Sequence, residues 1–173
     1  YNNSAVQTLE QVPERSTGEQ VPAFAEEHLL GPIGMDDSHF ATDPSGNAYT
    51  FMGLQSTCRD MARFGLLVLH DGAWGDDQVI PADWVEQATE RPSQDLNTTY
   101  GYLWWTNLVG TQGTSVSPLR AEEVPAAKQT QRVPGAPEEL RWALGLGGQI
   151  IQIDTDPRDI GRLWEKLAWL GAS

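Results

Sequence analysis

Residues 53–85 read GLQSTCRDMARFGLLVLHDGAWGDDQVIPADWV, and the first half of this stretch is the clearest helix signal in the chain. Its apolar residues recur at spacings of three and four positions, at Met61, Phe64, Leu67 and Val68. Such spacing is typical of a helix with one buried face. Ser56 or Thr57 can cap the first turn, and Gly72 can end the helix. We therefore predict an amphipathic helix between these caps.

Helical patterns also lie on both sides of this stretch. Apolar positions between Ala5 and Val12 have helical spacing, and we expect Pro13 and Gly18 to close that segment. The sequence PAFAEEHLL (22–30) predicts a second helix that stops at GPIG. In DQVIPADWVEQATE (77–90) a short extended piece leads into a helix with Pro81 in its first turn.

Strand signals begin near residue 96. TYGYLWWTN (99–107) is typical of an aromatic strand, and LRWALGLGGQIIQID (140–154) predicts two strands joined by a glycine turn. Residues 110–139, rich in Gly, Ser, Thr and Pro, indicate a long loop or flexible insertion. DIGRLWEKLAWLG (159–171) is amphipathic and predicts a final helix. The expected division is a helical region (1–95), sheet strands (96–154) and a terminal helix (155–173).

Composition restricts the classes of function. The 173 residues carry a net charge of −13, which repels nucleic acid and anionic membrane surfaces. No apolar run reaches the roughly 18 residues of a membrane span. Cys58 is the single cysteine, so an internal disulfide is excluded and the compartment, cytoplasmic or exported, stays open.

Other polar residues have ordinary interpretations. His28, His39 and His70 are scattered without the spacing of a metal site, so we expect no metal and no cofactor. Acidic pairs such as Glu26 and Glu27 are read as solvated faces. Asp60 and Arg63 are read as an exposed ion pair of little energetic weight at the start of the helix.

Several pieces occur in an order that resembles the serine β-lactamase and penicillin-binding-protein superfamily, specifically the class C β-lactamase-like esterases and amide hydrolases. They are YNN (1–3), ERSTG (14–18), LLGPIGM (29–35), the opening stretch 53–85, YGYLWW (100–105) and ALGLGGQIIQID (143–154). The resemblance implies an α+β fold of the β-lactamase/transpeptidase type, here incomplete, with helices and part of an antiparallel sheet. It also implies acyl transfer through a serine ester on a small ester or amide substrate.

The resemblance assigns a catalytic role to the first residues. Tyr1 matches the tyrosine of the family's Tyr-x-Asn motif and would be the general acid and base, while Asn3 would hold a lysine and the substrate carbonyl. A phenol with a pKa near ~10 can act at neutral pH only beside cations that stabilise its phenolate. The alternatives are a frayed terminal aromatic for Tyr1 and a routine helix cap for Asn3.

The family's third motif is matched by Leu146, Gly147 and Gly148. The resemblance makes the backbone N–H of Gln149 an oxyanion donor, although a plain glycine turn is the alternative. Leu146 stands where the family has a cationic residue or histidine, which favours neutral esters or amides over classical β-lactams. Tyr102 and Trp104 could form a substrate-binding wall, or they could belong to the core.

The nucleophile motif Ser-x-x-Lys does not occur in this sequence. The two lysines are Lys128 and Lys166, and Pro125 and Leu163 stand three positions before them. We expect the chain to be the carboxy-terminal part of a serine hydrolase, inactive without the amino-terminal portion of the same domain and exposing core surface where that portion packs. The alternative is a non-catalytic remnant or binding module with the same fold.

Overall fold

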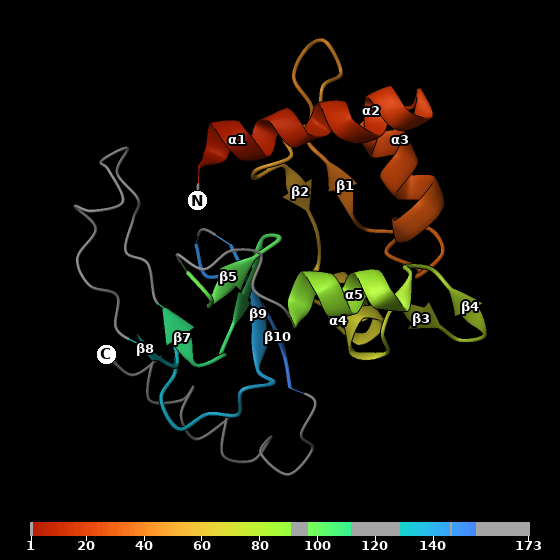
Figure 1. Cartoon of the computed structure of the whole chain (residues 1–173). Helices are drawn as coiled ribbons and strands as arrows, with labels where there is room; N and C mark the ends of the chain where they lie inside the picture. Colours follow the sequence, from red (N-terminus) through yellow and green to blue (C-terminus); the bar gives the residue numbers. More distant parts are fainter. Residues whose placement is uncertain (1, 91–96, 112–128, 146, 155–173) are drawn as a thin grey trace. The chain divides into compact units, whose positions relative to one another are not determined.

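The computed structural model describes residues 2–90, 97–111, 129–145 and 147–154. These residues group into two compact units. The first contains the described residues of 1–82 and 145–149, and the second those of 83–144 and 150–173. Figure 1 shows the helices at the start of the chain in red and orange and the later strands in green and blue.

The first unit begins with three consecutive helical segments, α1 (Asn3–Gln7), η1 (Thr8–Glu10) and α2 (Gln11–Thr17). Gly18 ends them in the left-handed conformation, with φ of 80°, as the sequence predicts. The expectation that Pro13 closes the segment is wrong. Pro13 lies in the first turn of α2, where a helix does not need the backbone N–H that proline lacks.

The second predicted helix is formed by α3 (Val21–Ala25) and the π-helical segment η2 (Glu26–Leu30), and the residue after it is Gly31. Strands β1 (His39–Phe40) and β2 (Leu54–Gln55) then pair antiparallel. The opening stretch folds as predicted, with α4 (Cys58–Leu69) capped by Thr57, whose Oγ1 accepts the N–H of Asp60 at 3.2 Å. A short hairpin follows, formed by β3 (Ala73–Trp74) and β4 (Asp77–Gln78).

An apolar cluster holds the first unit together. Its buried members are Leu30, Ile33, Met35 and Leu67, and half-buried Phe64, Trp74 and Ile80 pack against them. Leu67 and Phe64 come from the predicted buried face of α4. The apolar face of α4 therefore packs as its sequence pattern predicts, against buried residues of the GPIGM turn (31–35).

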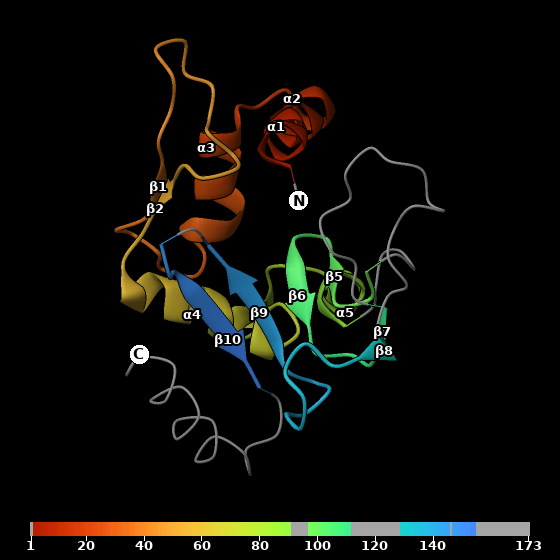
Figure 2. The same cartoon turned by 90° about the vertical axis from the view of Figure 1, so that its left-hand side faces the viewer.

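The second unit contains α5 (Ala82–Thr89), which begins at the unit boundary, and a sheet of four antiparallel strands in the order β10-β9-β6-β5. The strands are β5 (Tyr100–Gly101), β6 (Trp104–Thr106), β9 (Arg141–Leu144) and β10 (Ile150–Ile153). β6, β9 and β10 lie side by side in Figure 2. Two further strands, β7 (Gly110–Thr111) and β8 (Gln129–Thr130), pair inside the segment predicted as a loop.

The aromatic segment 99–107 is a hairpin and not the single strand that its composition predicts. Tyr102 and Leu103 both adopt positive φ, 46° and 70°, and turn the chain between β5 and β6. A two-residue turn of this kind normally carries Asn or Gly. The turn could not be predicted from the sequence, because Tyr102 and Leu103 occupy the positions where Asn or Gly is usual.

One row of side chains crosses all four strands of the sheet. Tyr100 stands opposite Trp105, Trp105 opposite Trp142, and Trp142 opposite Gln152. Trp142 Nε1 donates to Gln152 Oε1 at 3.0 Å. The guanidinium carbon of Arg132 lies 3.9 Å from the centroid of the Trp105 ring, and a cation over a ring face is attracted by its π electrons. This ladder fixes the register of the sheet.

Helices and an antiparallel sheet thus make up the described chain, which confirms the α+β class. Among the described residues, no helix is both long and apolar enough to cross a lipid bilayer. The predicted terminal helix 155–173 lies outside the described residues. The division predicted at residues 95 and 154 stays a prediction.

Candidate functional site

Two site residues were predicted at the start of the chain. Tyr1 lies outside the described residues. Asn3 is the first residue of α1 and is exposed, and the helix cap is its neighbour Asn2, whose Oδ1 accepts the N–H of Ala5 at 3.1 Å. Within the part of the chain that the structure describes, the Asn3 side chain has no hydrogen-bond partner. The capping alternative therefore applies to Asn2 and leaves the Asn3 amide available.

The predicted glycine turn lies between β9 and β10. Gly147 and Gly148 have φ of 85° and 88°, a conformation that only glycine adopts without strain. The N–H of Gly145 donates to the carbonyl of Gln149 at 2.8 Å, which closes the turn, while Leu146 lies outside the described residues. A Cβ added to Gly148 would meet open space, so the backbone here is accessible from outside.

Gln149 follows this turn and is exposed. Its carbonyl is used in closing the turn, but its N–H donates to none of the residues that the structure describes. An accessible backbone N–H next to two glycines is the kind of donor that stabilises an oxyanion. The geometry of the turn is thus compatible with the predicted role, which stays a prediction.

Tyr102 and Trp104 belong to the second unit. Tyr102 lies at the tip of the β5–β6 hairpin, where its hydroxyl accepts a 3.0 Å hydrogen bond from Gln87 Nε2. Its ring meets Trp84 edge to face, with centroids 5.3 Å apart. Trp104 is half-buried at the start of β6. Tyr102 is thus an exposed aromatic residue held by α5, while Trp104 is partly incorporated in the sheet.

Asp60 shows the largest difference from the sequence interpretation. It is fully buried, and its Oδ2 accepts hydrogen bonds from Ser38 Oγ at 2.9 Å and from the Asp37 N–H at 3.2 Å. Arg63 Nη1 donates to Oδ1 at 2.5 Å. Burial raises the pKa of Asp60, but the hydrogen bonds from Ser38 and Arg63 outweigh it and hold the pKa below its ordinary value. Asp60 is therefore a buried carboxylate paired with a half-buried Arg63, and the two do not form the exposed ion pair that the sequence predicts.

A cavity of about 190 Å³ lies in the second unit. Thr89, Thr106, Arg141 and Glu138 are among the residues that line it. The Arg141 guanidinium there is engaged with Thr89 Oγ1 and Glu90 Oε1. No predicted site residue among those described lines this cavity, so it adds no group to the proposed acyl chemistry.

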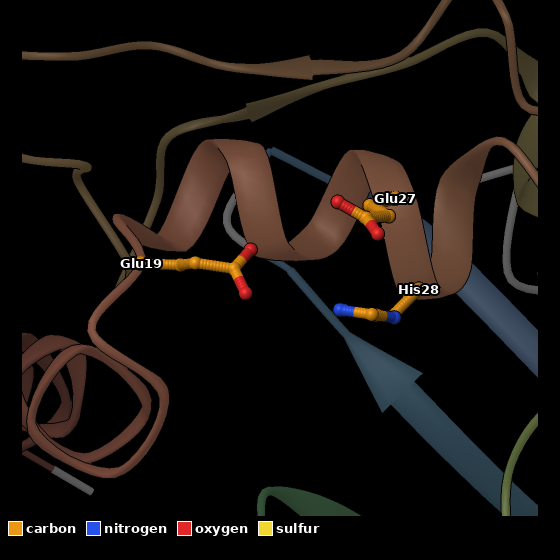
Figure 3. A group of neighbouring side chains, drawn as sticks. All are labelled: Glu19, Glu27 and His28. Carbon is orange, nitrogen blue, oxygen red and sulfur yellow. The ribbon is translucent and has the colours of Figure 1, made fainter.

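Three potential metal ligands gather on the first unit, from α3–η2 and the residues just before it. Figure 3 shows the side chains of Glu19, Glu27 and His28 directed toward a common region. One ligand atom of each lies within 4.8 Å of the others. This cluster has no signal in the sequence, because Glu19 lies eight positions before Glu27 and only the fold brings the two side chains together.

The sequence profile of the Beta-lactamase family matches residues 1–156. The chain belongs to this family. The match includes the Tyr-x-Asn motif, α4 and the glycine turn, and it confirms the resemblance seen in the sequence. The family match therefore supports the predicted β-lactamase-like superfamily for this chain.

Known proteins similar to this chain are longer. The 6-aminohexanoate-dimer hydrolase of Paenarthrobacter ureafaciens is 26% identical over 103 residues, which are 59% of this chain and 26% of that protein. A solved Bacillus anthracis structure, named as a 6-aminohexanoate-dimer hydrolase, superposes with a TM-score of 0.64 at 24% identity. A solved Bacteroides dorei structure, named as a β-lactamase, gives a TM-score of 0.61 at 21% identity.

These superpositions cover 90% and 92% of this chain but only 35% and 46% of the two solved chains. At such identities they show the fold alone, which is the predicted β-lactamase-like α+β fold in part. The chain thus spans less than half the length of each of these three relatives.

Proposed function

We propose that this chain is the carboxy-terminal part of a serine hydrolase that cleaves ester or amide bonds through an acyl-enzyme. The observation that carries the proposal is the family match over residues 1–156 in a chain that has no Ser-x-x-Lys. The solved relatives have more than half of their length outside the matched part, which leaves room for the nucleophile. The chain alone would then be inactive.

In this proposal a serine of the amino-terminal portion attacks the substrate carbonyl carbon. The phenolate of Tyr1, stabilised by the ammonium of a lysine of that portion, takes the hydroxyl proton, because serine is a weak nucleophile until a base removes that proton. The C–O or C–N bond then breaks, and the same proton goes to the leaving alcohol or amine. Water hydrolyses the serine ester in a second cycle of the same steps and releases the acid.

The residues of this chain contribute at two points. The exposed Asn3 amide can donate to the substrate carbonyl and accept from the lysine ammonium. The N–H of Gln149, which donates to none of the described residues, would supply one oxyanion donor, and removal of such a donor typically costs about 3–4 kcal/mol of transition-state stabilisation. The two positive-φ glycines beside it let the substrate approach the backbone closely.

The sequence favours neutral substrates, and the names of two relatives point to amides. Leu146 places no positive charge in the third motif, so a substrate carboxylate has no cation to bind there. Two of the similar proteins are named as hydrolases of the 6-aminohexanoate dimer. We therefore expect neutral esters and amides as substrates, and the linear 6-aminohexanoate dimer, an amide with a terminal carboxylate, is the compound to compare with them in the assay.

The first test is intact-mass spectrometry of the protein from its native source after treatment with a fluorophosphonate, which labels activated serines. The expected result is a species heavier than 19.0 kDa that carries one adduct. An unlabelled species at 19.0 kDa would overturn the proposal. It would support the second candidate, a non-catalytic remnant or binding module, which the absence of Ser-x-x-Lys favours.

A second test uses the longer labelled form. Tyr1→Phe is expected to lower kcat by about 10²–10⁴-fold, the usual contribution of a positioned acid and base. Tyr49→Phe is a matched control that removes a phenol outside the proposed site and should leave kcat unchanged. Equal activity of both variants would remove Tyr1 from the mechanism while leaving the serine assignment intact.

A further inference from the structure

We propose that Glu19, Glu27 and His28 bind a zinc ion on the first unit. The ligand atoms of the three side chains lie within 4.8 Å of one another (Figure 3). Imidazole nitrogen and carboxylate oxygen are both zinc ligands, and three protein ligands with a water in the fourth position form a common zinc arrangement. The proposal is independent of the acyl chemistry, since none of the three belongs to the predicted catalytic site.

The backbone holds the three residues on neighbouring segments. Gly18 turns the chain in the left-handed conformation directly before Glu19, whose N–H donates to Thr17 Oγ1 at 3.1 Å. Glu27 and His28 lie in the π-helical segment η2, in which the Gly31 N–H reaches the Glu26 carbonyl at 2.9 Å. A π-helical turn is rare and is frequently found at functional sites.

The His28 ring is also oriented. Its centroid lies 4.6 Å from that of the Phe24 ring, with 54° between the ring planes. Phe24 is four positions earlier and thus on the same face of the helix. This contact limits the rotation of the imidazole and reduces the entropy that would be lost when a ring nitrogen binds a metal.

The spacing of the three groups favours an intervening ion over direct contacts. Among the residues that the structure describes, none forms a hydrogen bond or ion pair with the side chain of Glu19, Glu27 or His28. Two carboxylates this close repel each other, and a divalent cation between them reverses the sign of that interaction. Zinc bonds of about 2.1 Å in a tetrahedron separate ligand atoms by about 3.4 Å, so the side chains need to move by roughly 1 Å.

Because Glu19 precedes α3 and the other two ligands follow it, the ion would tie the two ends of this helix together. Binding to the folded state alone stabilises that state in proportion to the logarithm of metal concentration. We therefore expect zinc to raise the melting temperature of the chain. A cation attracted only by the general surface charge would stabilise the chain whether or not Glu19, Glu27 and His28 were present.

The experiment is a titration of the full chain with zinc chloride by isothermal calorimetry at pH 7.5. It is done in a Cys58→Ser background, because the exposed Cys58 thiol is itself a zinc ligand. One equivalent of zinc is expected to bind. His28→Ala, Glu19→Gln and Glu27→Gln should each weaken the affinity at least tenfold.

Two matched controls accompany these variants. Glu26→Gln removes an exposed carboxylate adjacent to Glu27, and His70→Ala removes an exposed imidazole elsewhere in the same unit. Both should bind zinc as the background protein does. Circular dichroism of every variant checks that the exposed substitutions leave the fold intact.

The pH dependence gives a second readout. Metal ligands bind in their deprotonated forms, so the affinity for zinc should fall as the pH is lowered. Absence of a one-to-one binding event, or equal weakening in the ligand and control variants, would overturn the proposal. Neither result would affect the proposed hydrolase, whose test is serine labelling.

Discussion

Arg141 on β9 donates a 2.6 Å hydrogen bond to Oγ1 of Thr89 at the end of α5, and both residues are buried. The same nitrogen donates to Glu90 Oε1 at 2.7 Å. A charge-assisted bond of this kind is stronger than a neutral one. It joins the sheet of the second unit to its helix, across fifty-two positions of sequence.

Replacement of this arginine is expected to destabilise the second unit. Arg141→Met keeps the length of the side chain but removes its hydrogen bonds to Thr89, to Glu90 and to the Glu139 carbonyl, and we expect the free energy of unfolding to fall by about 2–3 kcal/mol. Glu90→Gln should cost less than about 1 kcal/mol, because the Glu90 side chain is 42% exposed. Urea denaturation of both variants measures the difference. Similar midpoints for the two would show that the Thr89 contact carries no stability.

The part of the fold that could be predicted from sequence is the part in which local signals agree. In α4 the apolar period, the Thr57 cap and Gly72 all indicate one helix, and the structure has that helix. The burial of Asp60 could not be predicted, because nothing in the sequence indicates that Ser38, twenty-two positions earlier, donates to it. Burial of a polar residue depends on such distant partners, which a local pattern does not contain.

The same distinction applies to the candidate site. Gly147 and Gly148 could be predicted as a turn because glycine has a known conformational role. The Glu19 cluster could not, since its members become neighbours only through the turn at Gly18 and the π-helical segment. Site residues whose roles come from family resemblance, such as Asn3, stay predictions until activity is measured.

The β5–β6 turn offers a stabilising substitution. Leu103 has φ of 70°, and a left-handed conformation costs a residue with a Cβ about 1–2 kcal/mol. Leu103→Gly should raise the free energy of unfolding by about 1 kcal/mol, since the leucine is 46% exposed and loses little burial. Leu103→Ala keeps the Cβ and should give no gain. Thermal unfolding of the pair is decisive, because an equal effect of Gly and Ala would exclude relief of backbone strain.

Two glycines around the β3–β4 hairpin should respond differently to alanine. Gly72 and Gly75 both have positive φ, 82° and 62°. A Cβ at Gly75 would have no neighbour within 4 Å, so Gly75→Ala should cost only the conformational term of about 1 kcal/mol. A Cβ at Gly72 would collide with the backbone carbonyl of Ile80, and Gly72→Ala should cost about 3 kcal/mol or more. Equal urea midpoints for the two variants would contradict the close approach at Gly72.

The buried Asp60 predicts how stability depends on pH. Burial raises its pKa, but the hydrogen bonds from Ser38 and Arg63 lower the pKa by more than burial raises it. The pKa of Asp60 in the folded protein therefore lies below the ordinary value of 3.8. A carboxyl with a lower pKa in the folded state stabilises the fold above its unfolded pKa, and this contribution disappears as the pH falls through the folded value. Asp60→Asn should therefore unfold at lower urea than wild type at pH 7, with a difference that shrinks below about pH 4. Asp76→Asn, at an exposed hairpin position, should follow the wild-type curve. A difference between Asp60→Asn and wild type that stays constant from pH 7 to the acid limit would mean that ionisation of Asp60 contributes nothing to the fold.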